Sequence, residues 1–223
     1  MKNKIHIDDT KETQEITLPE DLGFGRVFTD RMFTQKYNAQ DGWHNPCVST
    51  YAPISLDPAA TVYHNGQMVF DGTKAYLRPD GDINLFRPEL NVERFNLSAA
   101  RMGMPSVDPA VHLEAIKMLI KLEHRWVPKK PGTSLYIRPT MISTEKTLEV
   151  RAGREYLHFI ILTPVAPYFA SGFSPVSVYV SVSVSASAAL SVSVSVSISV
   201  SVSVSVSVSV SVSVSVSVSV SVS

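Results

Sequence analysis

The chain has 223 residues, 20 basic and 20 acidic side chains, a formal net charge of zero and a single cysteine, Cys47. The even charge balance lacks the basic excess typical of nucleic-acid-binding proteins. The sequence also contains no run of roughly 18 apolar residues, which a membrane span would require. One cysteine excludes an intramolecular disulfide. The polar N-terminus has no apolar leader segment, so the sequence predicts a cytoplasmic protein with no membrane partner.

Composition changes sharply along the chain. Every charged residue lies at or before Glu155, whereas residues 181–223 are almost entirely alternating Ser and Val. The sequence therefore predicts three parts, which are a flexible arm over 1–19, a mixed α/β (α+β) domain over 20–176 and a low-complexity tail over 177–223. Strict period-2 alternation makes the tail β-prone, but without turn residues its register is undefined.

The first half of the domain is expected to contain mainly strands. Residues 25–37 are rich in β-branched and aromatic side chains and predict a strand, whereas Gly and Pro within 41–53 predict a long loop. Residues 61–88 predict short strands separated by turns. Pro79-Asp80-Gly81 predicts a hairpin turn, because Pro fixes one φ and Gly supplies a positive one.

Two helices and two further strands are expected next. Residues 88–103 place Val92, Phe95 and Ala99 on one apolar stripe. Asp108 is a favourable N-cap, and Pro109 suits the first turn of a second helix. The last two strands are predicted at 133–144 and 155–165. About six strands and two helices indicate a mixed α/β or α+β domain.

Five strings occur in a fixed order in this part of the sequence: LGFGRVFTDRMF, ISLDPAATVYHNGQMVFDGTKAY, LFRPELNVERF, GTSLYIRPTMI and ILTPVAPYFASG. Together they resemble the branched-chain amino acid aminotransferases, which are fold-type-IV enzymes that use pyridoxal 5'-phosphate (PLP). The resemblance covers about residues 20–176 and implies the smaller, N-terminal domain of that family.

The resemblance also implies site residues. Arg94 matches the arginine that binds the cofactor phosphate, and a guanidinium is suited to grip phosphate with two hydrogen bonds. Tyr136 and Arg138 match residues near the substrate carboxylate, and residues two apart on a strand face the same side. The other implied residues are apolar or aromatic and line the pocket for the substrate side chain: Phe24, Phe70, Val150 and Tyr168. Without the resemblance, Arg94 would be interpreted as a solvated helix residue and the two phenylalanines as core.

Some positions depart from the family pattern. Phe70-Asp71-Gly72 stands where the family has F-E-G, so a shorter carboxylate is present. The family's Schiff-base lysine belongs to its large domain, where this sequence is Ser and Val, and the last lysine here is Lys146. We therefore assign no catalytic residue and expect the chain to be inactive and not to bind PLP covalently. Lys74 matches a family lysine that is not catalytic and is interpreted as a surface residue.

Several functional hypotheses follow. The resemblance implies transfer of an amino group from Leu, Ile or Val to 2-oxoglutarate by a homodimer that acts on small amino and 2-oxo acids. The alternative is an artificial, non-catalytic chain that self-associates by β-aggregation through 181–223. A third hypothesis within the same fold is a D-amino acid aminotransferase or an aminodeoxychorismate lyase, but GTSLYIRP and LFRPELNVER favour the branched-chain enzymes. The six histidines and Cys47 show no metal-binding spacing.

Overall fold

The computed structural model describes residues 4–8, 16–167, 177–185 and 193–201. The chain divides into two compact units, Met1–Tyr168 and Phe169–Ser223. The first unit contains β1 (His6–Asp8), β2 (Arg31–Asn38), β3 (Gly42–Thr50), α1 (Thr61–Asn65), β4 (Met68–Phe70), β5 (Thr73–Leu77), β6 (Ile83–Leu85), α2 (Pro88–Arg101), α3 (Pro109–Leu122), a 3-10 turn (His124–Trp126), β7 (Ser134–Ser143) and β8 (Glu155–Val165). The second contains β9 (Ser177–Ser185) and β10 (Ser193–Ser201).

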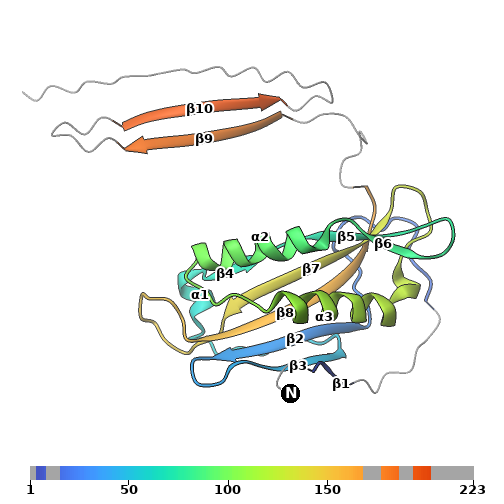
Figure 1. The fold of residues 1–223 in the computed structure, drawn as a ribbon, viewed down its shortest axis with the longest axis horizontal. Helices are drawn as coiled ribbons and strands as arrows, with labels where there is room; N and C mark the ends of the chain where they lie inside the picture. The colour runs from blue at the N-terminus through green and yellow to red at the C-terminus, as the bar shows by residue number, and fades with distance from the viewer. Residues whose placement is uncertain (1–3, 9–15, 168–176, 186–192, 202–223) are drawn as a thin grey trace, which may run out of the picture. The chain divides into compact units, whose positions relative to one another are not determined.

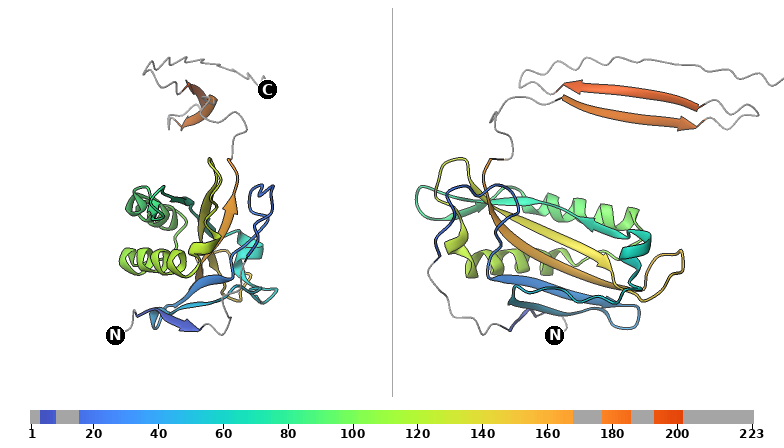
Figure 2. Two further views of the ribbon diagram at one scale, coloured as in Figure 1. Left: turned by 90° about the vertical axis from the view of Figure 1, so that its right-hand side faces the viewer. Right: turned by 180° about the vertical axis from the view of Figure 1, so that it is seen from behind.

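The first unit is a mixed α+β domain built on one sheet. The eight strands have the order β1-β3-β2-β8-β7-β5-β6, with β4 also paired to β7. Helices α2 and α3 lie together on one face of this sheet (Figures 1 and 2). The predicted mixed class is thus confirmed for this unit. Among the described residues, no helix has both the length and the apolar character needed to cross a membrane.

Strand β7 gives the two faces of the sheet their different characters. It pairs antiparallel with β8 along its whole length. Leu135 and Ile137 are fully buried in the cluster that includes Ile116 and Leu119 of α3. Because side chains alternate along a strand, Tyr136 and Arg138 lie on the opposite face, away from the helices.

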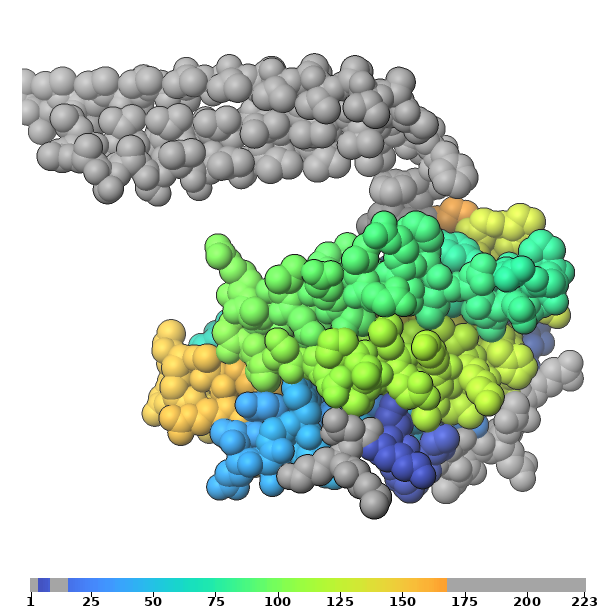
Figure 3. Space-filling model, viewed as in Figure 1, coloured from blue at the N-terminus to red at the C-terminus, as the bar shows by residue number. Residues whose placement is uncertain are grey.

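The two helices cover the sheet as the sequence predicts. Val92, Phe95 and Ala99 are the buried residues of α2. The side chain of Asp108 accepts a hydrogen bond from the Ala110 amide at 2.9 Å, which caps α3. Figure 3 shows these helices as one layer of green and yellow-green atoms over the sheet.

The predicted loop over 41–53 is wrong, because most of it forms β3. Pro46 is tolerated in this strand by an irregularity of the ladder with β2, where the register shifts opposite Asn45 and Pro46. Asn45 has a positive φ of 51° at this point. A bulge accepts a residue that lacks an N–H donor, so the Gly and Pro pattern here marks a bulged strand rather than a loop.

Two other boundaries in the first half differ from expectation. The strand predicted over 25–37 begins only at Arg31, because Gly23 and Gly25 have positive φ values of 56° and 69° and turn the chain before it. The start of 61–88 forms the short helix α1, which ends at Asn65 and is capped by Gly66. The turn at Pro79-Asp80-Gly81 is confirmed, since it joins the antiparallel pair β5 and β6.

The N-terminal segment is partly ordered by the sheet. Within the predicted arm over 1–19, β1 pairs in parallel with β3. Ile5 is only 8% exposed and belongs to the apolar cluster under α3. Burial of this one side chain gives the segment a reason to pair, which a polar composition does not reveal.

The second unit contains a two-stranded antiparallel sheet in its described residues. β9 and β10 pair from Ser193 opposite Ser185 to Ser201 opposite Ser177, so that like residues mostly face like residues. The predicted β-prone character of the tail over 177–223 as a whole stays a prediction. Moving one strand by two residues would preserve the same kinds of pairs, because the sequence repeats with that period.

Two histidines form part of the core between α3 and β8. The rings of His112 and His158 stack with their centroids 4.9 Å apart, and Phe95 contacts both. Both side chains are at most 2% exposed. Burial lowers the pKa of His112 from 6.5 to about 4. The pKa of His158 is lowered well below 6.5, mainly by burial and secondly by the charge of a protonated His112 beside it.

These histidines make the free energy of unfolding depend on pH. Below about pH 6.5 these two histidines are protonated in the unfolded chain but stay neutral in the folded chain. The free energy of unfolding therefore falls as the pH is lowered. In His112→Phe, we expect the loss between pH 7 and pH 4 to be smaller than in the wild type by about 3 kcal/mol. Urea unfolding at several pH values measures this difference. Parallel pH profiles for variant and wild type would contradict it.

Candidate active site

The candidate site begins on the face of β7 that the helices leave open. Nε of Arg138 donates a hydrogen bond to the Tyr136 hydroxyl at 3.2 Å. The guanidinium carbon of Arg138 also lies 4.3 Å from the centre of the Phe70 ring, a cation–π contact. Phe70 belongs to β4, whose pairing with β7 brings the ring beside the arginine.

A loop before the first long strand completes this group. The Phe24 and Tyr136 rings lie 5.0 Å apart at an angle of 58°. Phe24 sits between the two glycines whose positive φ values turn the chain. A pocket of about 180 Å³ opens here and is lined by Phe24, Gly25, Phe28, Tyr136, Arg138, Ile161 and Thr163.

A kink between β4 and β5 connects this face to helix α2. Both strands pair with β7, and the Asp71 amide between them donates to the Pro139 carbonyl at 3.0 Å. At the next residue, a Cβ on Gly72 would lie 2.6 Å from Cζ of Tyr136 and would overlap its hydroxyl. Glycine is therefore required by space, because the tyrosine lies directly against the backbone.

Asp71 also binds the arginine that the sequence assigns to phosphate. Nε of Arg94 donates to Oδ1 of Asp71 at 2.6 Å, and the Asn91 amide donates to Oδ2 at 3.0 Å. The Asp71 side chain is 5% exposed, whereas that of Arg94 is 63% exposed. The hydrogen bond to this carboxylate raises the pKa of Arg94, so the guanidinium stays charged.

The structure brings most of the predicted residues together. Phe24, Phe70, Tyr136 and Arg138 form one cluster, and Arg94 is linked to it through Asp71 and Gly72. Val150 is 92% exposed in the loop beyond the far end of β7, and Tyr168 lies outside the described residues. Lys74 lies opposite Tyr136 in the ladder between β5 and β7.

Sequence reasoning did not assign Asp71, Gly72 or Asn91 to the site. The replacement of Glu by Asp at position 71 was a visible signal, but only the structure reveals which arginine the carboxylate contacts. Asn91 lies three residues before Arg94 on α2 and so shares its helix face. This spacing allows one helix to supply both partners of the same carboxylate.

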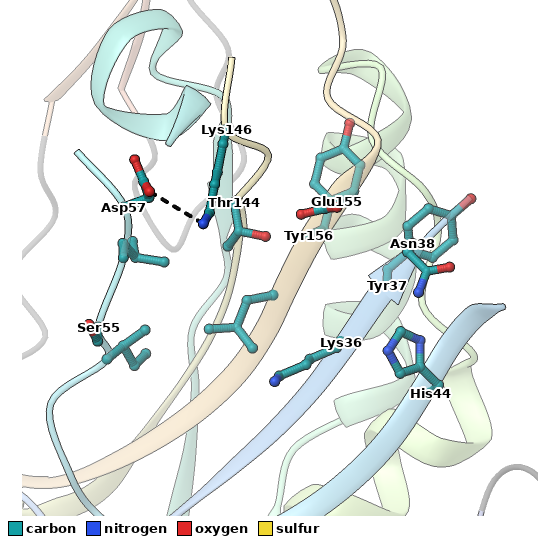
Figure 4. Close-up of a pocket in the computed structure, with 13 residues that line it drawn as sticks. Lys36, Tyr37, Asn38, His44, Ser55, Asp57, Thr144, Lys146, Glu155 and Tyr156 are labelled. Atoms are coloured by element: carbon teal, nitrogen blue, oxygen red, sulfur yellow. Dashed lines mark ion pairs between the residues drawn. The ribbon is translucent and has the colours of Figure 1, made fainter. Parts of the chain in front are cut away.

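A second pocket, of about 440 Å³, lies elsewhere in the first unit (Figure 4). Residues 54–57 form one wall, and side chains of β2, β3 and β8 form others. Asp57 and Lys146 form an ion pair of 3.3 Å in this pocket. The pKa of Asp57 is lowered, mainly by the hydrogen bond from the Ala59 backbone amide and secondly by the hydrogen bond from Lys146. None of the predicted site residues that the structure describes lines this pocket. Within the described ranges, no three His, Cys, Asp or Glu side chains gather as a metal site.

Sequence comparison shows which proteins the chain is similar to. The chain is 47% identical over 181 residues to branched-chain-amino-acid transaminase 1 of Bacillus subtilis, a match that covers 81% of this chain and 51% of that protein. It is 48% identical over 160 residues to a probable branched-chain-amino-acid aminotransferase of Streptomyces coelicolor, covering 71% and 44%. Over the matched region, the chain is homologous to the branched-chain aminotransferases. It spans about half the length of the curated relatives it matches.

Solved structures of such enzymes are also similar to the chain. The enzyme from Thermobaculum terrenum in its PLP form matches with a TM-score of 0.48 and 18% identity, over 66% of this chain and 44% of that one. The Escherichia coli enzyme matches with a TM-score of 0.46 and 19% identity, over 62% and 40%. No family model matches the sequence.

The contact between Gly72 and Tyr136 can be tested by a double-mutant cycle. We expect Gly72→Ala to lower the free energy of unfolding by about 1–3 kcal/mol, because the new methyl group displaces the tyrosine ring. In a Tyr136→Ala background, the same substitution should cost far less, since the space is then open. Urea unfolding of the four proteins measures the coupling.

Gly153→Ala is the matched control for this cycle. Its Cβ would meet Ser143 instead of Tyr136. Its cost should therefore be the same with and without the tyrosine ring. An equal cost of Gly72→Ala in both backgrounds would show that Tyr136 does not occupy the space over the kink.

Proposed function

We propose that the first unit forms one wall of a PLP-dependent branched-chain aminotransferase site, which transfers an amino group from Leu, Ile or Val to 2-oxoglutarate. The convergence of two arginines on the Asp71-Gly72 kink, in a chain homologous to these enzymes, carries this proposal. Arg94 reaches the kink from α2, and Arg138 reaches it from β7 by way of Tyr136. Two separate cations suit a reaction in which a cofactor phosphate and a substrate carboxylate must both be held.

The chemistry of Arg94 fits a phosphate. Its Nε is occupied by Asp71, and in the described part of the chain neither Nη group has a hydrogen-bond partner. Two adjacent N–H donors on a charged, exposed group match the oxygens of a phosphate. PLP, when bound, supplies the electron sink that amino transfer requires.

Arg138 and its aromatic neighbours fit the substrate. The hydroxyl of Tyr136 accepts from Nε of Arg138, which orients the guanidinium for a carboxylate. The Phe24 and Phe70 rings flank this pair and leave an apolar surface beside the charge. Such a surface favours an aliphatic side chain over a polar one, by roughly 1–3 kcal/mol for each methylene that it buries.

Several parts of the proposal go beyond these contacts. The side-chain pocket would include Val150 and Tyr168 as well, and the acting form would be a homodimer that takes small amino and 2-oxo acids. The expectation that the chain is inactive and does not bind PLP covalently rests on Lys146 being the last lysine of the sequence. It stays a prediction.

The phosphate role of Arg94 is tested with a ligand pair that differs only in the phosphate. We expect Arg94→Ala to weaken the binding of pyridoxine 5'-phosphate by about 10- to 100-fold, the range for losing charge-assisted hydrogen bonds, and to leave pyridoxine binding unchanged. Titrations of the full chain followed by NMR measure both affinities. Arg101→Ala, on the same helix and also exposed, is the control. The proposal fails if the two variants behave alike.

The second unit supports a second candidate, which is self-association through β pairing. The observation in its favour is the register of β9 and β10, in which nine consecutive residues pair and like mostly faces like. An uncharged strand with this repeat presents equivalent registers to other copies of itself.

Deletion of residues 181–223 tests this candidate. We expect the full chain to sediment as large species that bind thioflavin, and the shortened chain to do neither, because β10 and more than half of β9 are then removed. A chain with Val194, Val196 and Val200 replaced by Lys keeps the length but adds charge, and should also stay dispersed. A full chain that sediments as one small species would overturn the candidate.

A further inference from the structure

We propose that Asp71 is a positioning residue, which holds Arg94 by its Nε so that both Nη groups remain available to a phosphate. This inference rests on the proposed function and assigns a role to a residue outside the predicted site. It depends on three features, which are the fixed carboxylate, the side of the guanidinium that it binds and the difference in exposure between the two partners.

The carboxylate of Asp71 is fixed from several directions. Its backbone amide donates to Pro139 of β7, and its Oδ2 accepts from the Asn91 amide at 3.0 Å. Asn91 also donates to the Gly72 carbonyl at 3.2 Å, which joins α2 to the kink. A buried carboxylate with these partners cannot follow a moving arginine, so the arginine must adopt the geometry that the carboxylate offers.

The contact uses only one edge of the guanidinium. Oδ1 accepts from Nε at 2.6 Å, whereas an end-on pair would occupy the Nη groups instead. An exposed arginine side chain has many rotamers and loses about 2 kcal/mol of conformational entropy when it is ordered. Asp71 imposes that order before any ligand binds, so a phosphate meets a guanidinium that is already restrained.

Two other roles for Asp71 make different predictions. If the ion pair only stabilised the fold, its loss would change stability and leave ligand affinity alone; a pair with one exposed partner contributes little to stability. If Asp71 only neutralised Arg94, its removal would strengthen the attraction for an anion. Positioning alone predicts that loss of the carboxylate weakens phosphate binding even though a negative charge is removed.

The experiment compares wild type, Asp71→Asn, Asp71→Glu and Arg94→Ala as full chains, using pyridoxine 5'-phosphate and pyridoxine as probes at one ionic strength. For Asp71→Asn, we expect about tenfold weaker binding of the phosphorylated probe, the loss of about one charge-assisted hydrogen bond, with no change for pyridoxine. Asp71→Glu should recover most of the affinity, because it restores the charged carboxylate, which the amide of Asn lacks. Added to Arg94→Ala, Asp71→Asn should cause no further loss.

Urea unfolding of each variant separates ligand binding from folding, and Asp71→Glu keeps the test decisive if Asp71→Asn is destabilised. Wild-type or tighter binding of the phosphorylated probe by Asp71→Asn, while Arg94→Ala binds weakly, would overturn the positioning role and leave the proposed function intact. Equal binding by wild type and Arg94→Ala would overturn both.

Discussion

The alternation of side chains along β7 is the constraint on which the rest of the structure depends. Leu135 and Ile137 are buried beneath α3, and this burial fixes which face of the strand is turned to the core. The residues that follow each of them, Tyr136 and Arg138, are thereby placed on the other face. A shift of one residue in the pairing with β8 would exchange the two sets. The same apolar burial that stabilises the domain therefore also orients the charged side chain of the candidate site.

The Asp71-Gly72 kink joins this face to the helix layer. β4 and β5 both pair with β7, and the break between them leaves a backbone against which Tyr136 packs. On its other side, the Asp71 carboxylate binds Arg94 and Asn91 of α2. The positions of the two arginines are consequently coupled through two residues of backbone.

Local sequence patterns predict the long helices and strands of this fold. They do not predict the elements whose geometry depends on a bulge or on contacts with distant segments. The stripe of α2, the Asp108 cap and strands β7 and β8 follow from periodicity and capping, which act within a few residues. β3 was interpreted as a loop because Pro46 occupies a bulge that exists only through pairing with β2. Phe24, Phe70, Tyr136 and Arg138 could be named from resemblance, but the link from Arg94 through Asp71 depends on contacts between distant segments.

The exposed rings around Arg138 indicate a face built for contact with a ligand or another surface. Phe70 is 55% exposed and Phe24 is 38% exposed, although each touches another site residue. Leaving such area in water forgoes about 25 cal/mol for each Å² that could be buried. The guanidinium of Arg138 lies over the rings of Phe70 and Tyr136, and Phe24 packs against Tyr136, so a charge and partly exposed apolar surface lie side by side. A carboxylate with an aliphatic side chain would contact both the cation and the rings, which is the kind of ligand that the proposed function requires.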